Sequence, residues 1–231
     1  MLRGMAEPNA YGAGAAGDAP PYRSYVGPWF KYDLVAAMQF NLLTRLGLRE
    51  DHYLLDVGCG SLRGGRLFIP YLLPGRYFGI EPEAWLIEEG IENELGRDAI
   101  RIKQPTFSHL GDFRLSSLGQ DFDFILAQSI FTHAAERQIR TCLTEAKRVL
   151  KEGGKMAATY FPGPQNHVGD EWVYPGGTTY QPEYMRSMAA DAGLDLAPLD
   201  WRHPNKNQRW LLICHEGAAA QAAGVTGPAA G

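Results

Sequence analysis

The hydrophobic residues in the middle of this chain fall into short continuous runs separated by stretches of helical spacing. The apolar runs, typical of buried strands, cover 53–57, 76–80, a short segment near 105–110, 122–128 and 155–161. Apolar residues at every third or fourth position predict helices over about 63–73, 83–95 and 139–150, the last ended by Gly153-Gly154. Strands that alternate with helices in this way predict an α/β fold with a mostly parallel sheet.

Two further strands near 194–200 and 209–215 follow a helix bracketed by Pro182 and Gly193. No helix separates these two strands, and a connection of roughly eight residues is too short for a parallel crossover. We therefore expect them to pair antiparallel and to close the sheet.

The segment from Trp29 to Leu48 has the spacing of an amphipathic helix that packs against the domain. Its predicted apolar face consists of Phe30, Leu34, Ala37, Met38, Leu42 and Leu46. Residues 1–21 and 217–231 are mainly Ala, Gly and Pro with few large apolar residues, and we expect both to be disordered. The folded domain is then expected to span 22–216.

The strongest chemical signal is the junction LLDVGCGSLRGG, which covers 54–65. A strand, a glycine turn and a helix in this order form the place where doubly wound α/β proteins hold nucleotide-like cofactors. Gly58 and Gly60 can take backbone angles that other residues avoid and let a ligand approach the main chain. A dinucleotide fingerprint needs a third glycine where Arg63 stands, which argues against a nicotinamide cofactor.

The second strand ends in an acidic residue, in the sequence RYFGIEP over 76–82. Glu81 lies twenty-one residues beyond Gly60, which fits a carboxylate that accepts two hydrogen bonds from a ribose diol. The alternative is that Glu81 caps the helix that Pro82 begins.

These two motifs are followed by FDFILAQSIFTH (122–133) and RVLKEGGKMAATYF (148–161). Together the four segments resemble the class I S-adenosylmethionine-dependent methyltransferases of the small-molecule type, over about residues 28–216. The resemblance implies a Rossmann-like sheet of seven strands, mostly parallel with an antiparallel closing strand and with helices on both faces. It also implies S-adenosylmethionine as the cofactor.

The resemblance further implies which residues hold that cofactor. The methionine part and ribose are expected to contact Asp56, Gly58, Cys59 and Gly60. Arg63 can pair with the cofactor carboxylate through its planar fork, or it can stand solvated at the start of the helix.

The rest of the cofactor is expected to meet residues that follow the third and fourth strands. In SHLGDFRLSS (108–117), Asp112 would receive the adenine amino group and Phe113 would stack on the ring, the alternative being an ordinary turn aspartate. Gln128, between Ala127 and Ser129, is expected at the mouth of the site, because ligands of open α/β sheets lie beyond the carboxyl ends of the strands.

Methyl transfer to a hydroxyl requires a base, and His133, just past the fourth strand, is the candidate. A structural histidine at this turn is the alternative. The long segment 161–181 lacks periodicity and is expected to be an acceptor-binding loop or else a flexible surface loop. The expected acceptor-binding residues are Tyr160, His167, Glu171, Trp172 and His203.

The sequence AQSIF after the fourth strand excludes two relatives of this family. It lacks the Asn/Asp-Pro-Pro-aromatic run of enzymes that methylate nucleobase amines, and it lacks the carboxylates with which catechol-type enzymes hold magnesium. A metal site built from His167, Asp170, Glu171 and His203 would have no known ligand spacing, so no metal is expected.

The composition of the chain argues against some classes of binding partner. A length of 231 residues suits one α/β domain, and a net charge of −4 without a Lys/Arg cluster argues against nucleic acid. The chain shows no signal-peptide pattern and no apolar run of membrane-spanning length, so we expect a cytoplasmic protein with no membrane partner. The three cysteines Cys59, Cys142 and Cys214 are expected to be reduced packing residues.

The sequence therefore predicts an S-adenosylmethionine-dependent methyltransferase that methylates a hydroxyl of a small polar acceptor, such as a sugar, a glycoside or another natural product. Three alternatives stay open: an N-methyltransferase of a small amine or peptide, a non-catalytic S-adenosylmethionine-binding protein, and an NAD-dependent oxidoreductase. The last needs a third glycine and a Tyr-Lys or His constellation that is not evident. The sequence leaves the acceptor and the formation of a homodimer open.

Overall fold

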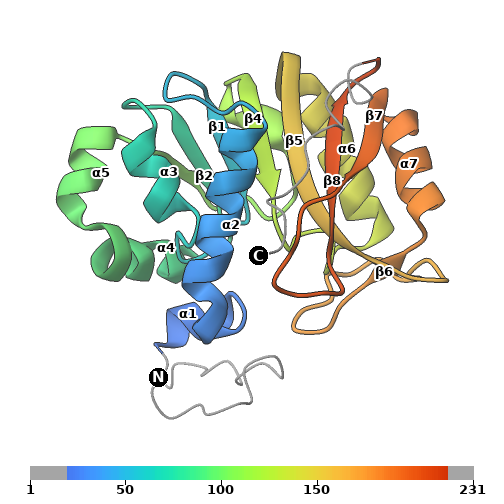
Figure 1. Ribbon diagram of the computed structural model, residues 1–231, viewed down its shortest axis with the longest axis horizontal. Coiled ribbons are helices and arrows are strands. Elements are labelled where there is room, and N and C mark those ends of the chain that lie inside the picture. The colour runs from blue at the N-terminus through green and yellow to red at the C-terminus, as the bar shows by residue number, and fades with distance from the viewer. Residues whose placement is uncertain (1–19, 218–231) are drawn as a thin grey trace.

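The computed structural model describes residues 20–217, which form one twisted sheet with helices on both faces (Figure 1). The order of the strands along the sheet is β3-β2-β1-β4-β5-β8-β7. The parallel part consists of β1 (Leu54–Val57), β2 (Tyr77–Ile80), β3 (Thr106–Ser108), β4 (Phe122–Ala127) and β5 (Leu150–Pro162). Strand order reverses between β1 and β4, which places a topological switch point at the carboxyl ends of these strands.

The closing strands are β7 (Leu194–Leu199) and β8 (Arg209–His215). Strand β8 pairs antiparallel with β7, as the short connection between these two strands predicts, and it also pairs antiparallel with β5. A short strand that the sequence pattern does not predict, β6 (Thr179–Tyr180), pairs parallel with the end of β5. The expected α/β fold class is confirmed, with β6 as an addition to the seven strands.

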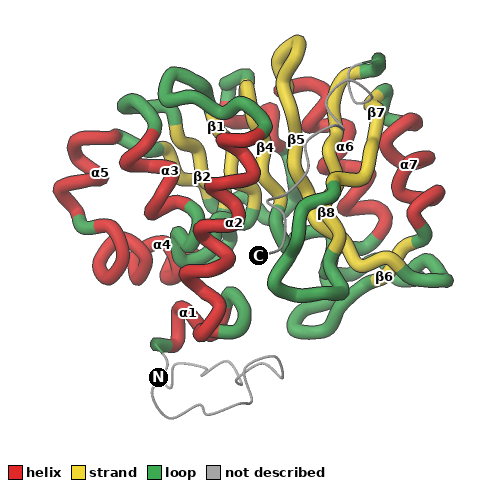
Figure 2. Tube along the Cα trace, in the orientation of Figure 1, coloured by secondary structure: helices red, strands yellow, loops and turns green. Residues whose placement is uncertain are grey.

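Two layers of helices cover the sheet and enclose separate apolar cores (Figures 1 and 2). One core is covered by α2 (Tyr32–Arg45), α3 (Gly65–Tyr71), α4 (Ala84–Gly90) and the π-helical turn Ile91–Leu95. The other is covered by α6 (Glu136–Val149), α7 (Pro182–Asp191) and the 3₁₀ turn Leu115–Leu118. The remaining helical segments are α1 (Pro21–Tyr25), the 3₁₀ turn Trp29–Lys31 and α5 (Arg97–Lys103).

The glycine pair Gly153-Gly154 was expected to end a helix, and this prediction is wrong. Helix α6 ends at Val149 and β5 begins at Leu150, so the pair lies inside the strand. The pairing of β4 with β5 shifts register between Phe122 and Phe124, and Gly153 has a φ of 77°, which only glycine adopts easily. The glycines therefore serve an irregular strand start instead of a helix terminus.

The predicted apolar face of the N-terminal helix is wrong in its first half. Met38, Leu42 and Leu46 are buried as expected, but Phe30 is 65% exposed and Leu34 is 57% exposed. Ala37 is exposed as well. The first part of the predicted helix is a 3₁₀ turn, Trp29–Lys31, with fewer residues per turn, so Phe30 does not share the angular position that α-helical spacing assigns to it.

The predictions of disorder for 1–21 and 217–231 concern residues that lie outside the described part, apart from residues 20, 21 and 217, and Pro21 begins α1. The three cysteines are buried and unpaired, as expected. Within residues 20–217, none of the helices combines the length and the apolar character that crossing a membrane requires.

Candidate active site

A cavity of about 900 Å³ lies beyond the carboxyl ends of β1, β2 and β4. The loops 163–178 and 200–208 gather with α1 at this edge of the sheet, at the bottom of the view in Figure 2. The volume of the cavity is typical of a site for a cofactor or a drug-sized ligand. The lining residues that the following argument uses are Gly58, Gly60, Arg63, Glu81, Phe113, Gln128, His133, Trp172 and His203.

The glycine turn forms the floor of the cavity. Gly58 and Gly60 both have positive φ, 73° and 55°. A side chain at Gly60 would begin 2.7 Å from Cγ1 of Val26, so only glycine leaves room for the segment that passes over it. The amides of Gly58 and Cys59 donate to the carbonyl of Ile80, at 2.8 and 3.0 Å, which ties the turn to the end of β2.

Glu81 joins this turn to the second strand. Its Oε2 accepts a hydrogen bond from the amide of Gly60, and its Oε1 accepts one from the amide of Glu83, each at 3.0 Å. Burial raises the pKa of the Glu81 carboxyl, while these two amides act in the opposite direction. Each carboxylate oxygen can accept a further hydrogen bond, so Glu81 supports the start of α4 and still offers acceptors to a ligand in the cavity.

Arg63 lies in the cavity wall without an acidic partner. Its Nη1 donates to the carbonyl of Val26 at 2.7 Å, and its Nη2 donates to Oε1 of Gln128 at 2.6 Å. Its Nε has no partner among the described residues, and no carboxylate of residues 20–217 forms an ion pair with it. Burial lowers the pKa of the guanidinium to about 10. A guanidinium group without an acidic partner can bind an anionic group of a ligand.

The amide of Gln128 is fixed by its neighbours. Its Oε1 accepts from Arg63 and, at 2.8 Å, from Nε2 of Gln39, so its Nε2 must point the other way. There it donates to Oγ of Ser129 at 2.5 Å and lies 3.2 Å from Nε2 of His203. Because arginine can only donate, the orientation of the amide follows from chemistry.

Both ring nitrogens of His203 have hydrogen-bond partners. Nε2 lies 3.2 Å from the amide nitrogen of Gln128, and Nδ1 lies 3.0 Å from the main-chain amide nitrogen of Asn205 and 3.2 Å from its carbonyl. Burial, with the positive charges of Arg63 and Lys31 nearby, lowers the pKa of His203 to about 4. Because of this low pKa, His203 is neutral at neutral pH, and it is a poor general base.

Among the described residues, His133 has hydrogen-bond partners on one ring nitrogen. Its Nδ1 lies 2.6 Å from the carbonyl of Gly176 and 3.1 Å from that of Val173, and both can only accept. Nδ1 therefore carries the proton, and Nε2 has no hydrogen-bond partner among the described residues. The ring packs against Trp172 and Tyr174 in the cavity wall, with centroids 5.6 and 5.1 Å away. Burial lowers the pKa of His133, so Nε2 keeps its lone pair at neutral pH.

Six predicted site residues lie elsewhere. Two are buried beneath the turn: Oδ2 of Asp56 accepts from the hydroxyl of Tyr77 at 2.8 Å, and Cys59 packs beside Gly79. Burial raises the pKa of Asp56 to about 7. Neither side chain lines the cavity, because the glycine turn folds over the end of β1 and puts main chain between them and any ligand.

The other four residues also lie outside the cavity. Asp112 points to solvent and pairs with Arg114 at 2.5 Å, whereas its neighbours Gly111 and Phe113 form the wall. Tyr160 is buried in the apolar core because alternate residues of β5 face it. His167 borders a groove along α6, and Glu171 is exposed. Of the predicted acceptor residues, the cavity brings together Trp172 and His203.

Several lining residues were not predicted. They are Val26, Lys31, Asn205, Asn207 and Gln208. Most lie in loops, where no periodicity signals position. Gln39, which bonds to Gln128 from behind the cavity wall, was also not predicted, although a polar side chain on the buried face of α2 is a visible signal. No group of three or more potential metal ligands occurs in the part of the chain that the structure describes.

Comparisons with known proteins agree with this geometry. Residues 55–156 match the family model described as a methyltransferase domain. A Bacillus subtilis (strain 168) protein named uncharacterized methyltransferase YcgJ is 25% identical over 140 residues, which make up 60% of this chain and 52% of that protein. The match thus spans about half the length of this curated relative.

Two solved structures illustrate the similarity of the fold. Magnesium protoporphyrin IX methyltransferase (ChlM) from Synechocystis PCC 6803 with bound SAH superposes with a TM-score of 0.61 at 13% identity, over 87% of this chain and 90% of that chain. The glycopeptide N-methyltransferase MtfA complexed with S-adenosyl-L-homocysteine gives 0.60 at 14% identity, over 79% and 90%. Residues 55–156 are therefore similar to a methyltransferase domain, and the described part of the chain shares the fold of these solved methyltransferases.

Proposed function

We propose that the cavity binds S-adenosylmethionine and that the protein transfers its methyl group to a hydroxyl of a small polar acceptor, with His133 as the general base. The observation that carries the hydroxyl assignment is the fixed tautomer of His133. Two carbonyls hold the proton on Nδ1, and Nε2 keeps a lone pair on a residue that lines the same cavity as the glycine turn and Glu81.

The residues of the cavity fit the chemical groups of this cofactor. Glu81 offers acceptors to the ribose hydroxyls, and Arg63 offers donors to the carboxylate. The main chain at Gly58 and Gly60 allows close approach of the methionine part. Phe113 supplies an apolar ring for the adenine.

The proposed reaction requires little covalent chemistry from the protein. S-adenosylmethionine supplies an electrophilic methyl group for an in-line displacement. The cavity must hold the acceptor oxygen in line and exclude water, and His133 must take the hydroxyl proton on Nε2. The carbonyls of Gly176 and Val173 then stabilise the resulting imidazolium through its Nδ1–H.

The acceptor side of the cavity favours a polyhydroxylated molecule such as a sugar or a glycoside. Amide side chains from the loop between β7 and β8 line it at Asn205, Asn207 and Gln208, and each can both donate to and accept from a hydroxyl. Trp172, which is partly exposed on the opposite loop, offers a flat ring for a sugar face to stack on.

The direct test is turnover with methyl-labelled S-adenosylmethionine and pairs of acceptors that differ only in a hydroxyl or an amine at one position. Label on the hydroxyl member supports the proposal. Label on the amine member alone identifies an N-methyltransferase, since an amine can arrive deprotonated and needs no protein base. Binding of the cofactor without turnover on any pair would favour a non-catalytic binding protein.

Replacing Glu81 with alanine should weaken binding of S-adenosylmethionine by about 1–3 kcal/mol, because the ribose loses its acceptors and the amides of Gly60 and Glu83 lose their partner. Isothermal titration calorimetry measures the change. Glu88→Ala, an exposed position on α4, is the control and should bind normally. Unchanged affinity in Glu81→Ala would show that this carboxylate only supports the turn.

Replacing Trp172 with alanine should raise the KM of a sugar acceptor by about tenfold and leave the affinity for the cofactor unchanged, because the stacking surface is lost. Steady-state kinetics at saturating cofactor measure it. Val168→Ala, in the same loop and 93% exposed, is the control. A weaker cofactor affinity in Trp172→Ala would instead place this ring over the cofactor.

A further inference from the structure

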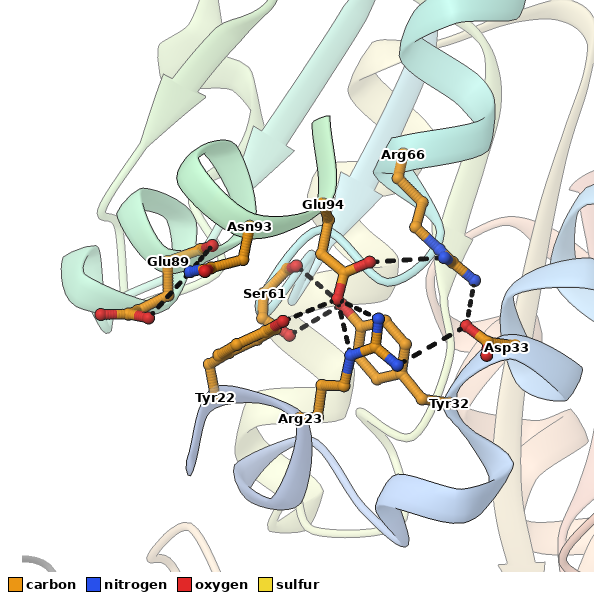
Figure 3. A network of polar contacts seen from close by, with 9 residues as sticks. All are labelled: Tyr22, Arg23, Tyr32, Asp33, Ser61, Arg66, Glu89, Asn93 and Glu94. Carbon is orange, nitrogen blue, oxygen red and sulfur yellow. Dashed lines mark hydrogen bonds and ion pairs between the residues drawn. The ribbon is translucent and has the colours of Figure 1, made fainter. Parts of the chain in front are cut away.

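Outside the cavity, a buried carboxylate ties together three segments of the chain (Figure 3). Glu94 lies on the π-helical turn Ile91–Leu95, and its side chain is 3% exposed. Its Oε1 accepts from the hydroxyl of Tyr22 at 2.9 Å and from Nε of Arg23 at 2.6 Å, both on α1. Its Oε2 accepts from Nη1 of Arg66 on α3 at 3.3 Å.

A second set of contacts extends this network to the glycine turn. Asp33 lies 2.5 Å from Arg66 and 3.9 Å from Arg23, so it bridges the two arginines. Both guanidinium groups face the ring of Tyr32, at 4.5 and 5.4 Å from its centroid. The hydroxyl of Tyr32 donates to the carbonyl of Ser61, which lies directly after Gly60 (Figure 3).

The segment 20–28, which these contacts hold, covers the cavity. Tyr25, Val26, Gly27 and Pro28 all line it. The side chain of Val26 lies over Gly60, and the carbonyl of Val26 accepts one of the two hydrogen bonds that Arg63 donates. The segment thus forms one wall and also orients the guanidinium.

Contacts with the rest of the fold, and not its own secondary structure, hold this segment in place. Helix α1 has 5 residues, of which one, Tyr22, is buried. A helix of this length does not persist without tertiary contacts. The polar contacts of Tyr22 and Arg23 with Glu94 attach its first half, and contacts of Tyr25 with Trp85 and Tyr174 attach its second half.

We propose that Glu94, although it touches no part of the cavity, is a positioning residue for the cofactor. It holds α1 in place, α1 holds Val26 on Arg63, and Arg63 is thereby presented to the carboxylate of the cofactor. This inference rests on the proposed binding of S-adenosylmethionine.

The test compares Glu94→Gln with Glu92→Gln, a matched change two residues earlier on the same turn. Glu92 is 51% exposed and pairs with Arg97 at the surface. Titration with S-adenosylhomocysteine should show binding about tenfold weaker in Glu94→Gln and unchanged in Glu92→Gln. Hydrogen exchange should rise in residues 20–28 of Glu94→Gln without a rise in β1 and β4.

A double-mutant cycle with Arg63→Gln separates positioning from general stability. If Glu94 acts through Arg63, Glu94→Gln should lower affinity much less in the Arg63→Gln background than in the wild type. Should Glu94→Gln fail to fold, Tyr22→Phe removes one attachment from the α1 side and leaves the buried carboxylate in place, and the same cycle applies.

Two results would overturn the inference: wild-type affinity in Glu94→Gln, or a loss that is fully additive with that of Arg63→Gln. Both require that the wild-type protein binds S-adenosylhomocysteine. A wild-type protein that does not bind it overturns the proposed function instead, so the two failures are distinguishable.

Discussion

His133→Gln should lower kcat by roughly 10²–10⁴, the range for loss of a general base, while the affinity for S-adenosylmethionine stays the same. Glutamine keeps a hydrogen-bonding side chain of similar size, so it can still contact the carbonyls of Gly176 and Val173. It cannot accept a proton near neutral pH. Single-turnover measurements are needed, because slow product release can hide a slower chemical step.

The pH profile gives a second readout of the same variant. Burial lowers the pKa of His133, so the neutral, proton-accepting form dominates at neutral pH, and the wild-type rate should fall only below that lowered pKa. This acid limb should be absent from His133→Gln and present in the control His52→Gln, a position outside the cavity. If His133→Gln has wild-type single-turnover rates across the pH range, His133 is not the general base, and an amine acceptor is favoured.

Arg63→Gln should weaken binding of S-adenosylhomocysteine by about 2–5 kcal/mol, which is at least about 30-fold, because the carboxylate of the ligand loses its charged partner in a partly buried site. Calorimetry with 5′-methylthioadenosine, which lacks the amino acid carboxylate, is the matched experiment. Its affinity should not change in Arg63→Gln. Equal losses for both ligands would mean that Arg63 only supports the cavity wall.

The order of elements was predictable from the sequence because periodicity reports burial directly. The strands of the parallel sheet and the antiparallel pairing of β7 with β8 follow from apolar runs and connection lengths. Helix α5 was not predicted: none of its residues is fully buried, and its contact with the apolar core is through the partly buried Ile100, which is too little for a periodic pattern. Periodicity also could not predict the phase of α2, because that depends on where the 3₁₀ turn gives way to α-helix.

For the candidate site, the residues that follow strand ends were the most predictable. Gly58, Glu81 and Gln128 come directly after β1, β2 and β4, and strand topology brings such positions together. Asp56 was misplaced because it still belongs to β1 and lies under the turn. Asn205 and Tyr174 lie on long loops whose paths depend on contacts between segments distant in sequence.

The amide of Gln128 has a thermodynamic consequence. It bonds to Arg63 on one side and to His203 on the other, so the two halves of the cavity share a single side chain. A ligand that turns or displaces this amide from either half changes the free energy of binding in the other half. Such coupling is reciprocal, so we expect cofactor and acceptor each to change the other's dissociation constant by the same factor.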